Sequence, residues 1–284
     1  MTFNEWISNI NAEFRDAGIE PQSRPLKAIM RYSEEFNTSI SFSSSTAKNI
    51  FKWFETHSKP RTHQIGSFHE SVYFYDYQFW VISIPLIYGR AQVDMLDCIK
   101  EMPHVMKDEM MSIHKEAWKY AIYWADTVDY GLGLDDLKNK EHLDKFGVQF
   151  LMAGAQELKA ATSILSQHRP DPRAVLNCGL ALEMFFKGYI AIKNGLTESE
   201  AKAIGHNLNK GFDKFIEISG IKQVDEIRPI LKIFPKIHER YQVQDISLEN
   251  VWKCYSFTHS VGATIVREFT NRNVLKNVIQ GEIL

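Results

Sequence analysis

Three side chains with acid–base or charge-pairing chemistry, Glu183, Lys187 and His206, occur in one stretch that is otherwise mostly apolar. The glutamate lies four residues before the lysine, which is the favourable order for an ion pair on a helix. One interpretation is a partly buried ion pair that faces a neighbouring helix, and the other is a functional polar site. His206 follows Gly205 at the start of the next expected helix, where it would cap or pack that helix.

His57, His63 and His69 recur at six-residue intervals and raise the question of a metal site. Metal-binding histidines on one helix prefer a separation of about four residues, and zinc-finger pairs have short spacings together with cysteines. The observed spacing, interrupted by Pro60 and Gly66, fits neither template. Because the sequence also has no glycine-rich phosphate loop, we predict neither a metal site nor a cofactor.

Composition and charge are those of an ordinary soluble protein of 284 residues, 44% hydrophobic and 24% charged. The net charge of −2 provides no overall attraction for nucleic acid, although a local basic patch is compatible with it. No apolar run reaches the length of a membrane span, and the first residues lack the apolar core of a signal peptide. Cys98, Cys178 and Cys254 are widely spaced in apolar surroundings, as buried reduced thiols are. These features predict a cytoplasmic protein that does not contact a membrane.

The first hundred residues combine helices with a short sheet. Residues 3–14 carry apolar side chains at helical spacing, and a second amphipathic segment begins with a capping residue near Ser45. Residues 67–96 are rich in aromatic and β-branched side chains, which favours two or three strands. We expect residues 1–103 to form an α+β module of unknown type.

From residue 104 onward the pattern is helical. Apolar residues at helical spacing predict one long helix that ends at Gly131, and small residues in the next helix would let a neighbour approach closely. Further helices are expected at residues 173–193, 207–219, 224–234 and 248–271. The predicted fold class is therefore α+β, with a small N-terminal module and an all-α bundle of five or six helices at residues 104–284.

The helix expected at residues 173–193 is apolar in almost every direction. Its exception is one seam, where Glu183 and Lys187 follow Leu176 and Leu180 within about 60° of the helix circumference. A helix that is hydrophobic nearly all round usually lies at the centre of a bundle. The two charged residues would then be the polar seam of a central helix.

The order of these elements is similar to that of the HEPN superfamily of α-helical bundles. A helix with small and apolar residues and a proline-containing break precede RAVLNCGLALEMFFKGYIAIKNGL, and a polar spacer and GHNLNKGFDKF follow it. HEPN members often show a glutamate before a lysine, then a glycine, a spacer and a Gly/Thr-His-x-Leu motif. RYQVQ at residues 240–244 resembles the Arg-Tyr segment that precedes the final helix of many members. The resemblance covers residues 105–275 or so.

The resemblance implies a bundle of four or five helices that forms a homodimer and either binds nucleotides or RNA or acts as a ribonuclease. On this basis Glu183, Lys187, His206, Arg240 and Tyr241 are the candidate ligand-binding residues.

Ribonuclease members carry an arginine followed a few residues later by a histidine, near the start of the final helix. No arginine of this sequence has that spacing. Cleavage without a metal needs a histidine as acid or base and an arginine that stabilises the developing phosphorane charge. His259 and Arg267 are the nearest substitute, although on one helix they would lie about 12 Å apart along the axis. A dimer would bring copies of them together, and they are the candidate catalytic residues.

We therefore expect a HEPN-like protein that binds nucleic acid or a nucleotide as a non-catalytic or divergent member, in a bacterial or phage stress or defence setting that the resemblance implies. One alternative is a divergent metal-independent ribonuclease that uses His259, Arg267, Arg240 or His206. The other is a dimerising scaffold for a protein partner.

Overall fold

The computed structural model describes residues 2–41, 44–58, 67–85, 93–221 and 227–281, except the side chains at positions 237 and 240. The chain divides into two compact units, Met1–Gly66 and Ser67–Leu284. This boundary falls earlier than the predicted domain boundary at residue 103. The reason is that the strands share one hydrophobic core with the helical bundle and belong to the second unit.

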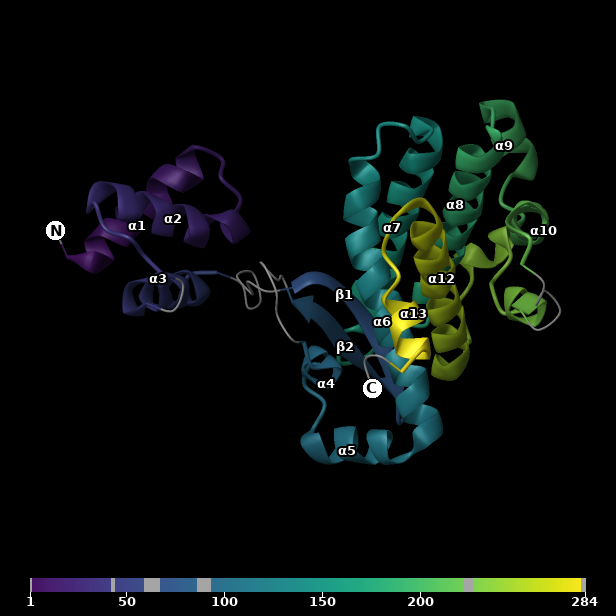
Figure 1. Cartoon of the computed structure of the whole chain (residues 1–284), viewed down its shortest axis with the longest axis horizontal. Coiled ribbons are helices and arrows are strands. Elements are labelled where there is room, and N and C mark those ends of the chain that lie inside the picture. Colours follow the sequence, from purple (N-terminus) through teal and green to yellow (C-terminus); the bar gives the residue numbers. More distant parts are fainter. Residues whose placement is uncertain (1, 42–43, 59–66, 86–92, 222–226, 282–284) are drawn as a thin grey trace. The chain divides into compact units, whose positions relative to one another are not determined.

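The first unit consists of three helices with a small core of their own (Figure 1). Its elements are α1 (Phe3–Asp16), the short 3-10 helix η1 (Pro21–Ser23), α2 (Arg24–Glu35) and α3 (Ser45–Thr56). Thr2 and Glu5 form a reciprocal capping box at the start of α1, and the Ser44 hydroxyl accepts from the Ala47 amide at the start of α3. Both predicted amphipathic helices are confirmed, and α2 lies between them.

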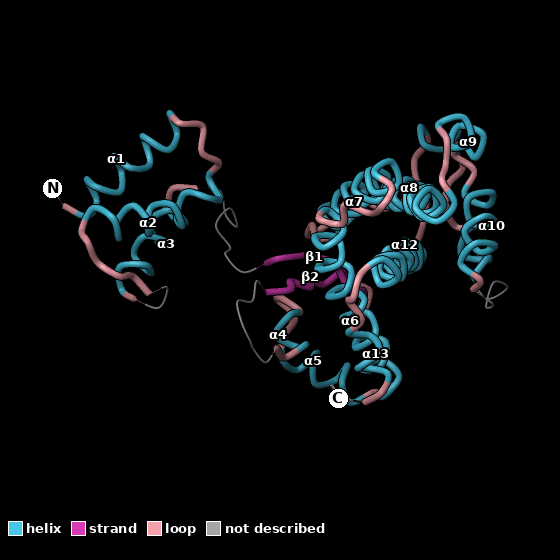
Figure 2. The backbone as a smooth tube through the Cα atoms, turned by 45° about the horizontal axis from the view of Figure 1, so that its top comes forward, coloured by secondary structure: helices cyan, strands magenta, loops and turns pink. Residues whose placement is uncertain are grey.

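The sheet of the second unit is a two-stranded antiparallel hairpin of β1 (Ser67–Tyr75) and β2 (Gln78–Pro85), drawn in magenta in Figure 2. Its turn residues Asp76 and Tyr77 both have positive φ, 49° and 56°, as the tight hairpin turn requires. The pairing register shifts between Ser67 and His69, which marks a bulge at the start of β1.

Four long helices form the centre of the second unit: α6 (His114–Lys138), α7 (Lys145–Leu165), α8 (Ala174–Asn194) and α12 (Leu248–Phe269). Helices α7 and α8 pack closely at Gly154, because this residue has no side chain. A Cβ there would lie 2.7 Å from the Phe185 ring. The shorter elements are α4 (Met95–Cys98), α5 (His104–Ser112), α9 (Glu198–Ile204), α10 (Leu208–Ser219), α13 (Val274–Ile279) and the 3-10 helices η2 (Arg228–Lys232) and η3 (Ile237–Tyr241). A small sheet beside a helical bundle confirms the predicted α+β class.

The helix predicted to end at Gly131 differs from the observed one. It is two helices, α5 and α6, separated at Ile113, and α6 continues through Gly131 to Lys138. Gly131 makes room instead of ending the helix, because a Cβ there would lie 2.6 Å from the Cβ of His69. Of the helix predicted at 224–234, residues 222–226 lie outside the described part, and the following residues form the short η2.

Helix α8 is the one described helix that is long and apolar enough to cross a membrane. Most of its apolar window, 67%, is buried inside the protein, as is typical of the core helix of a soluble protein. Its apolar character is therefore explained by its central position, in agreement with the prediction of a central helix.

Candidate functional site

Glu183, Lys187 and His206 form one connected group, which we call the cleft triad. The Lys187 ammonium donates to Glu183 Oε1 at 2.7 Å, and His206 Nδ1 lies 3.0 Å from Glu183 Oε2. The Glu183 and Lys187 side chains are each only 9% exposed, whereas that of His206 is 53% exposed. The interpretation of Glu183 and Lys187 as a buried ion pair is therefore confirmed, and the same pair also contacts an exposed histidine.

The backbone on both sides of His206 is held by local sequence. Helix α9 begins with a capping box at Thr197 and ends at Gly205, whose φ of 61° favours glycine. Directly after His206, the Asn207 side chain accepts from the amides of Asn209 and Lys210 and so caps α10. His206 thus sits between a helix end and a helix start, and its imidazole has a defined direction toward α8.

The hydrogen bonding of the triad fixes how the imidazole is used. Both oxygens of Glu183 are engaged, one by Lys187 and one by His206 Nδ1. Because a carboxylate accepts, Nδ1 carries the hydrogen, which leaves Nε2 of a neutral imidazole as a free acceptor. A carboxylate that orients a histidine in this way is the arrangement that positions a general base.

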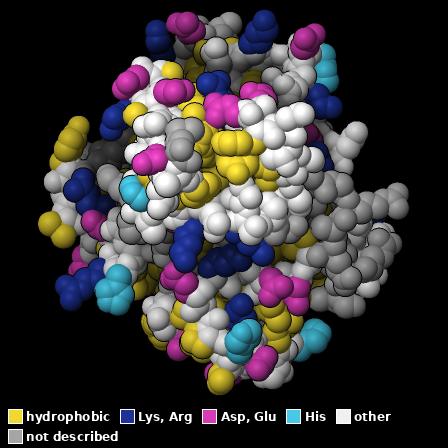
Figure 3. Space-filling model, turned by 90° about the vertical axis from the view of Figure 1, so that its left-hand side faces the viewer, with side chains coloured by type: hydrophobic (Ala, Val, Ile, Leu, Met, Phe, Trp, Pro, Cys, Tyr) yellow, Lys and Arg dark blue, Asp and Glu magenta, His cyan; other side chains and the backbone are white. Residues whose placement is uncertain are grey.

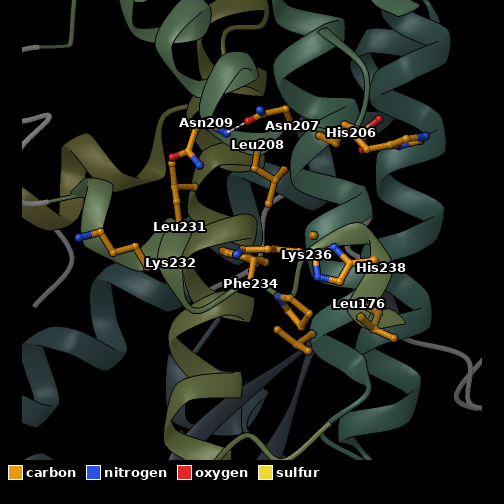
Figure 4. A pocket seen from close by; sticks show the side chains of 14 residues that line it. Leu176, His206, Asn207, Leu208, Asn209, Leu231, Lys232, Phe234, Lys236 and His238 are labelled. Atoms are coloured by element: carbon orange, nitrogen blue, oxygen red, sulfur yellow. Dashed lines mark hydrogen bonds and ion pairs between the residues drawn. The ribbon is translucent and has the colours of Figure 1, made fainter. Parts of the chain in front are cut away.

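Two members of the cleft triad, Glu183 and His206, line a cleft of about 680 Å³ between α8, the start of α10 and the segment from η2 to η3 (Figure 4). Its apolar lining comes from all three segments: Val175, Leu176, Leu208, Leu231, Phe234 and Pro235. Its polar lining is Glu183, His206, Asn207, Asn209, Lys232, Lys236 and His238. The cleft therefore combines apolar lining side chains with several nitrogen-bearing ones, and this combination suits a ligand that has both a flat apolar part and negative charge.

The basic side chains of the cleft lie on both sides of it. In Figure 4, Lys232 extends to the side opposite His206 and His238. His238 is 67% exposed, and its Nε2 lies 3.7 Å from Glu239 Oε1. Glu183 is the one acidic residue among the described lining residues, and both its oxygens are already engaged. The positive charges of Lys232 and Lys236 are consequently not paired with Glu183 and are available to a ligand.

Two further predicted ligand-binding residues, Arg240 and Tyr241, are the last two residues of η3. Tyr241 is 96% exposed and is not among the lining residues, and the side chain of Arg240 lies outside the described residues. The sequence prediction missed Lys232, Phe234, Lys236 and His238. Their signal was present in KIFPKIHERY, where basic residues and histidine alternate with apolar ones.

The predicted catalytic residues, His259 and Arg267, are not brought into this cleft. His259 is 1% exposed, and burial, followed by nearby His69 and Arg267, lowers its pKa well below the ordinary value. A buried neutral histidine without solvent access does not support the predicted role as acid or base.

Arg267 has a structural role instead. Its Nε donates to Asp129 Oδ2 at 2.7 Å and its other end to Asp126 Oδ1 at 2.5 Å. Asp129 also accepts from the amides of Val274 and Leu275 and thereby ties the C-terminal segment to α6. Because its guanidinium is engaged by two buried carboxylates, Arg267 is not available to a phosphate.

Of the three evenly spaced histidines, His57 and His69 belong to different units. His57 stacks on Trp53 in the first unit, with ring centroids 3.8 Å apart, and His69 lies in β1 of the second. His63 lies outside the described residues. Within the described ranges, no group of three or more His, Cys, Asp or Glu side chains could hold a metal ion.

Acidic and basic side chains are intermixed over the face drawn in Figure 3, in keeping with the net charge of −2. Because the whole chain carries a net charge of −2, the lysines of the cleft are a local concentration of positive charge. No protein-family model, no curated protein and no solved structure matches this chain. The functional argument accordingly starts from the geometry of the cleft.

Proposed function

We propose that the protein binds nucleotides or single-stranded nucleic acid in the cleft between α8, α10 and the η2–η3 segment. The observation that carries the proposal is that apolar lining side chains occur together with Lys232, Lys236, His206 and His238 in one cleft. Apolar and aromatic side chains accept the face of a base, while lysines neutralise phosphate. The exposed Tyr241, three residues after His238, provides a further surface on which a base can stack.

The HEPN resemblance belongs to the same proposal. It accounts for a central helix with the Glu183–Lys187 pair and for a histidine at the start of the next helix. As part of it, we propose that the protein acts in the cytoplasm as a homodimer, in a stress or defence setting. A buried ion pair is often no more stabilising than two apolar side chains in its place, so this one would then be kept because it orients His206 toward the ligand.

A binding titration tests the proposal. Fluorescence anisotropy of the full chain would be measured with a fluorescein-labelled single-stranded RNA and, separately, with a fluorescent ATP analogue, over a range of salt concentrations. The double variant Lys232→Ala/Lys236→Ala should weaken RNA binding by about 10-fold or more and reduce the salt slope by about 1.4, because each phosphate contact contributes about 0.7.

The control is Lys145→Ala, which removes an exposed lysine at the start of α7, outside the cleft lining. It should bind RNA like the unmodified protein. Absence of binding to either probe at low salt, or an equal loss in the control, would reject the cleft as the binding site.

A second candidate function, metal-independent RNA cleavage, is favoured by one specific observation. Two exposed histidines, His206 and His238, line the same cleft as two lysines. His206 Nε2 would take the proton of a ribose 2′-hydroxyl, and O2′ would attack phosphorus. The P–O5′ bond would break as protonated His238 gives its proton to O5′, so the products are a 2′,3′-cyclic phosphate and a 5′-hydroxyl. The lysines would stabilise the charge on the phosphorane.

Cleavage of a labelled RNA in the presence of EDTA distinguishes this function from binding alone. His206→Ala and His238→Ala should each lower the cleavage rate by about 100-fold or more, whereas His142→Ala, at an exposed position outside the cleft, should leave it unchanged. Intact RNA at high protein concentration, together with tight binding, would leave the protein a binder and reject the nuclease.

A further inference from the structure

Three aromatic side chains meet in the interior of the second unit, where β1, α6 and α12 pack together. The ring centroids of His69 and Tyr130 are 5.4 Å apart, those of Tyr130 and His259 5.0 Å, and those of His69 and His259 6.1 Å. Tyr130 and His259 are each 1% exposed. We call these three residues the internal cluster. It is separate from the cleft, since none of them is among the cleft residues.

Four polar atoms of the internal cluster are buried and have no hydrogen-bond partner among the described residues. They are His69 Nε2, Tyr130 Oη and both ring nitrogens of His259. Buried polar groups in folded proteins are hydrogen-bonded in the great majority of cases. Each one left unsatisfied costs a sizeable part of a domain's marginal stability, so four in one place indicate a partner that is not part of the chain.

The distance between the two histidines excludes a direct bond and fits a bridged one. Each imidazole nitrogen lies about 1.1 Å from its ring centroid, so nitrogens of rings 6.1 Å apart are separated by at least about 3.9 Å. A direct hydrogen bond needs about 2.7–3.2 Å. One oxygen atom bonded to both nitrogens needs a separation of about 4.5 Å, which exceeds this lower limit and is therefore compatible with the centroid distance.

The charge state of the cluster narrows the chemistry of that partner. Burial, with a smaller contribution from Lys159, lowers the pKa of His69 to about 4, and burial lowers that of His259 well below its ordinary value. Both imidazoles are therefore neutral near pH 7, and each presents one donor and one acceptor, as the Tyr130 hydroxyl also does. The partner must both donate and accept hydrogen bonds.

Charged partners fit less well. The guanidinium of Arg267 is engaged by Asp126 and Asp129, and the second cation that acts on the cluster, Lys159, is an exposed residue, so neither one neutralises a buried anion there. A metal-binding histidine normally has its second nitrogen held by an outer partner, and His259 has none among the described residues at either nitrogen. A small neutral molecule that donates and accepts remains, and water is the one that a folded protein always has at hand.

The sequence makes room for the three rings. A Cβ at Gly131 would lie 2.6 Å from the Cβ of His69, and a Cβ at Gly262 would lie 2.6 Å from the Tyr130 ring. The bulge at the start of β1 sets which residues of that strand face α6, and His69 is the first of them. The two glycines leave space for these polar rings in a part of the protein where apolar side chains are expected, and the bulge turns His69 toward them.

We propose that the internal cluster is a binding site for ordered water, in which one water molecule bridges His69 and His259 and the same or an adjacent water bonds to the Tyr130 hydroxyl. A buried water typically makes about three such bonds to polar groups that the chain leaves unpaired. The bridge would join β1 to α12, two elements far apart in the sequence.

The sign of a stability change tests this proposal in the full chain. His259→Phe replaces the imidazole by an apolar ring, and its melting temperature should fall by about 4–8 °C, because the bridging water loses its bonds. If the nitrogens were simply unsatisfied, the same change would remove an unfavourable burial and raise the melting temperature, which would overturn the proposal. His142→Leu, at an exposed position, is the control and should change little.

A double-variant cycle separates the bridge from a poor fit of phenylalanine. His69→Leu and His259→Phe should cost less together than the sum of their single effects, since either one breaks the shared bridge. Additive effects would contradict a shared water. A high-resolution crystal structure of the full chain should show water density within hydrogen-bonding distance of both histidines, and a metal ion there, detected by elemental analysis, would also reject the assignment.

Discussion

The cleft triad and the internal cluster are both built on histidine, yet they have opposite surroundings. His206 is half-exposed and bonded to a buried carboxylate, whereas His259 is fully buried and has no partner among the described residues at either nitrogen. Glu183 leaves one imidazole nitrogen of His206 free, next to a cleft lined by lysines. Since His259 is cut off from solvent, it keeps the neutral form and cannot exchange a proton readily.

The comparison shows that the partners of a histidine, more than its position on a helix, decide its chemistry. His259 lies on the final long helix, where a catalytic residue is expected from the HEPN resemblance, and the structure uses it in the core. His206 lies in a short connection and becomes the oriented one, because Glu183 is fixed by Lys187. Four changes would sharpen or break this contrast.

The largest effect is expected for Glu183→Ala. The variant leaves the Lys187 ammonium buried without its partner, so the free energy of unfolding should fall by about 3–5 kcal/mol. Urea unfolding at pH 7 measures it. The double variant Glu183→Leu/Lys187→Met removes both charges and should recover most of the loss. A single variant that costs under about 1 kcal/mol would mean that the pair is not buried.

Acid should destabilise the protein through the internal cluster. The pKa of His69 in the folded state is lowered to about 4, below the ordinary value of about 6.5, and that of His259 is lowered as well. The unfolded chain therefore binds more protons, and stability that is fully present above pH 6.5 is lost as the pH falls toward 4. His69 alone corresponds to a loss of up to about 3 kcal/mol.

Urea unfolding between pH 7 and pH 4 tests this dependence. Tyr123, Tyr130 and Tyr255 surround His259, and their pKa values are raised by burial, so they stay neutral throughout. The free energy of unfolding should depend less steeply on pH in His69→Leu and in His259→Phe, whereas His142→Leu should keep the slope of the unmodified protein. An unchanged slope in the first two variants would show that other groups carry the acid sensitivity.

A smaller effect is expected for Asn207→Ala, which removes the cap of α10. Loss of the two bonds from the amides of Asn209 and Lys210 should cost about 1 kcal/mol. Hydrogen exchange should become faster in the first turn of α10, next to His206, while α12 is unaffected. Asn209→Ala, an exposed neighbour that makes no cap, is the matched control.

The smallest effect on stability is expected for His206→Ala, within about 0.5–1 kcal/mol, because the side chain is half-exposed. Its effect should appear instead in binding of labelled RNA, or in cleavage if the second candidate function holds. If His206→Ala destabilised the protein as much as His259→Phe, the contrast between the two clusters would fail.

Much of the local structure could be predicted from the sequence. The apolar periodicity of α8, the glutamate four residues before its lysine and the capping residues around α9 and α10 act within one or two helical turns, so they are readable without knowledge of packing. The aromatic and β-branched run at residues 67–96 likewise predicts strands, because these side chains fit a pleated surface. Glu183 and Lys187 were found in this way.

Other features depend on segments that are distant in the sequence. Gly131 looks like a helix end until His69 of β1 occupies the space above it, and His259 looks like a catalytic candidate until Tyr130 and β1 enclose it. Local rules carry no information about which segment packs where.

The sequence by itself therefore determined helices α1, α3, α8, α10 and α12, the cap of α3 and the polar seam of α8, since each arises from neighbours along the chain. Only the tertiary structure decided that His206 reaches Glu183, that Lys232, Lys236 and His238 face the same cleft, and that His259 is buried. The physical reason is that burial and ion pairing between separate elements are set by how the bundle packs, and that packing decides which histidine meets solvent.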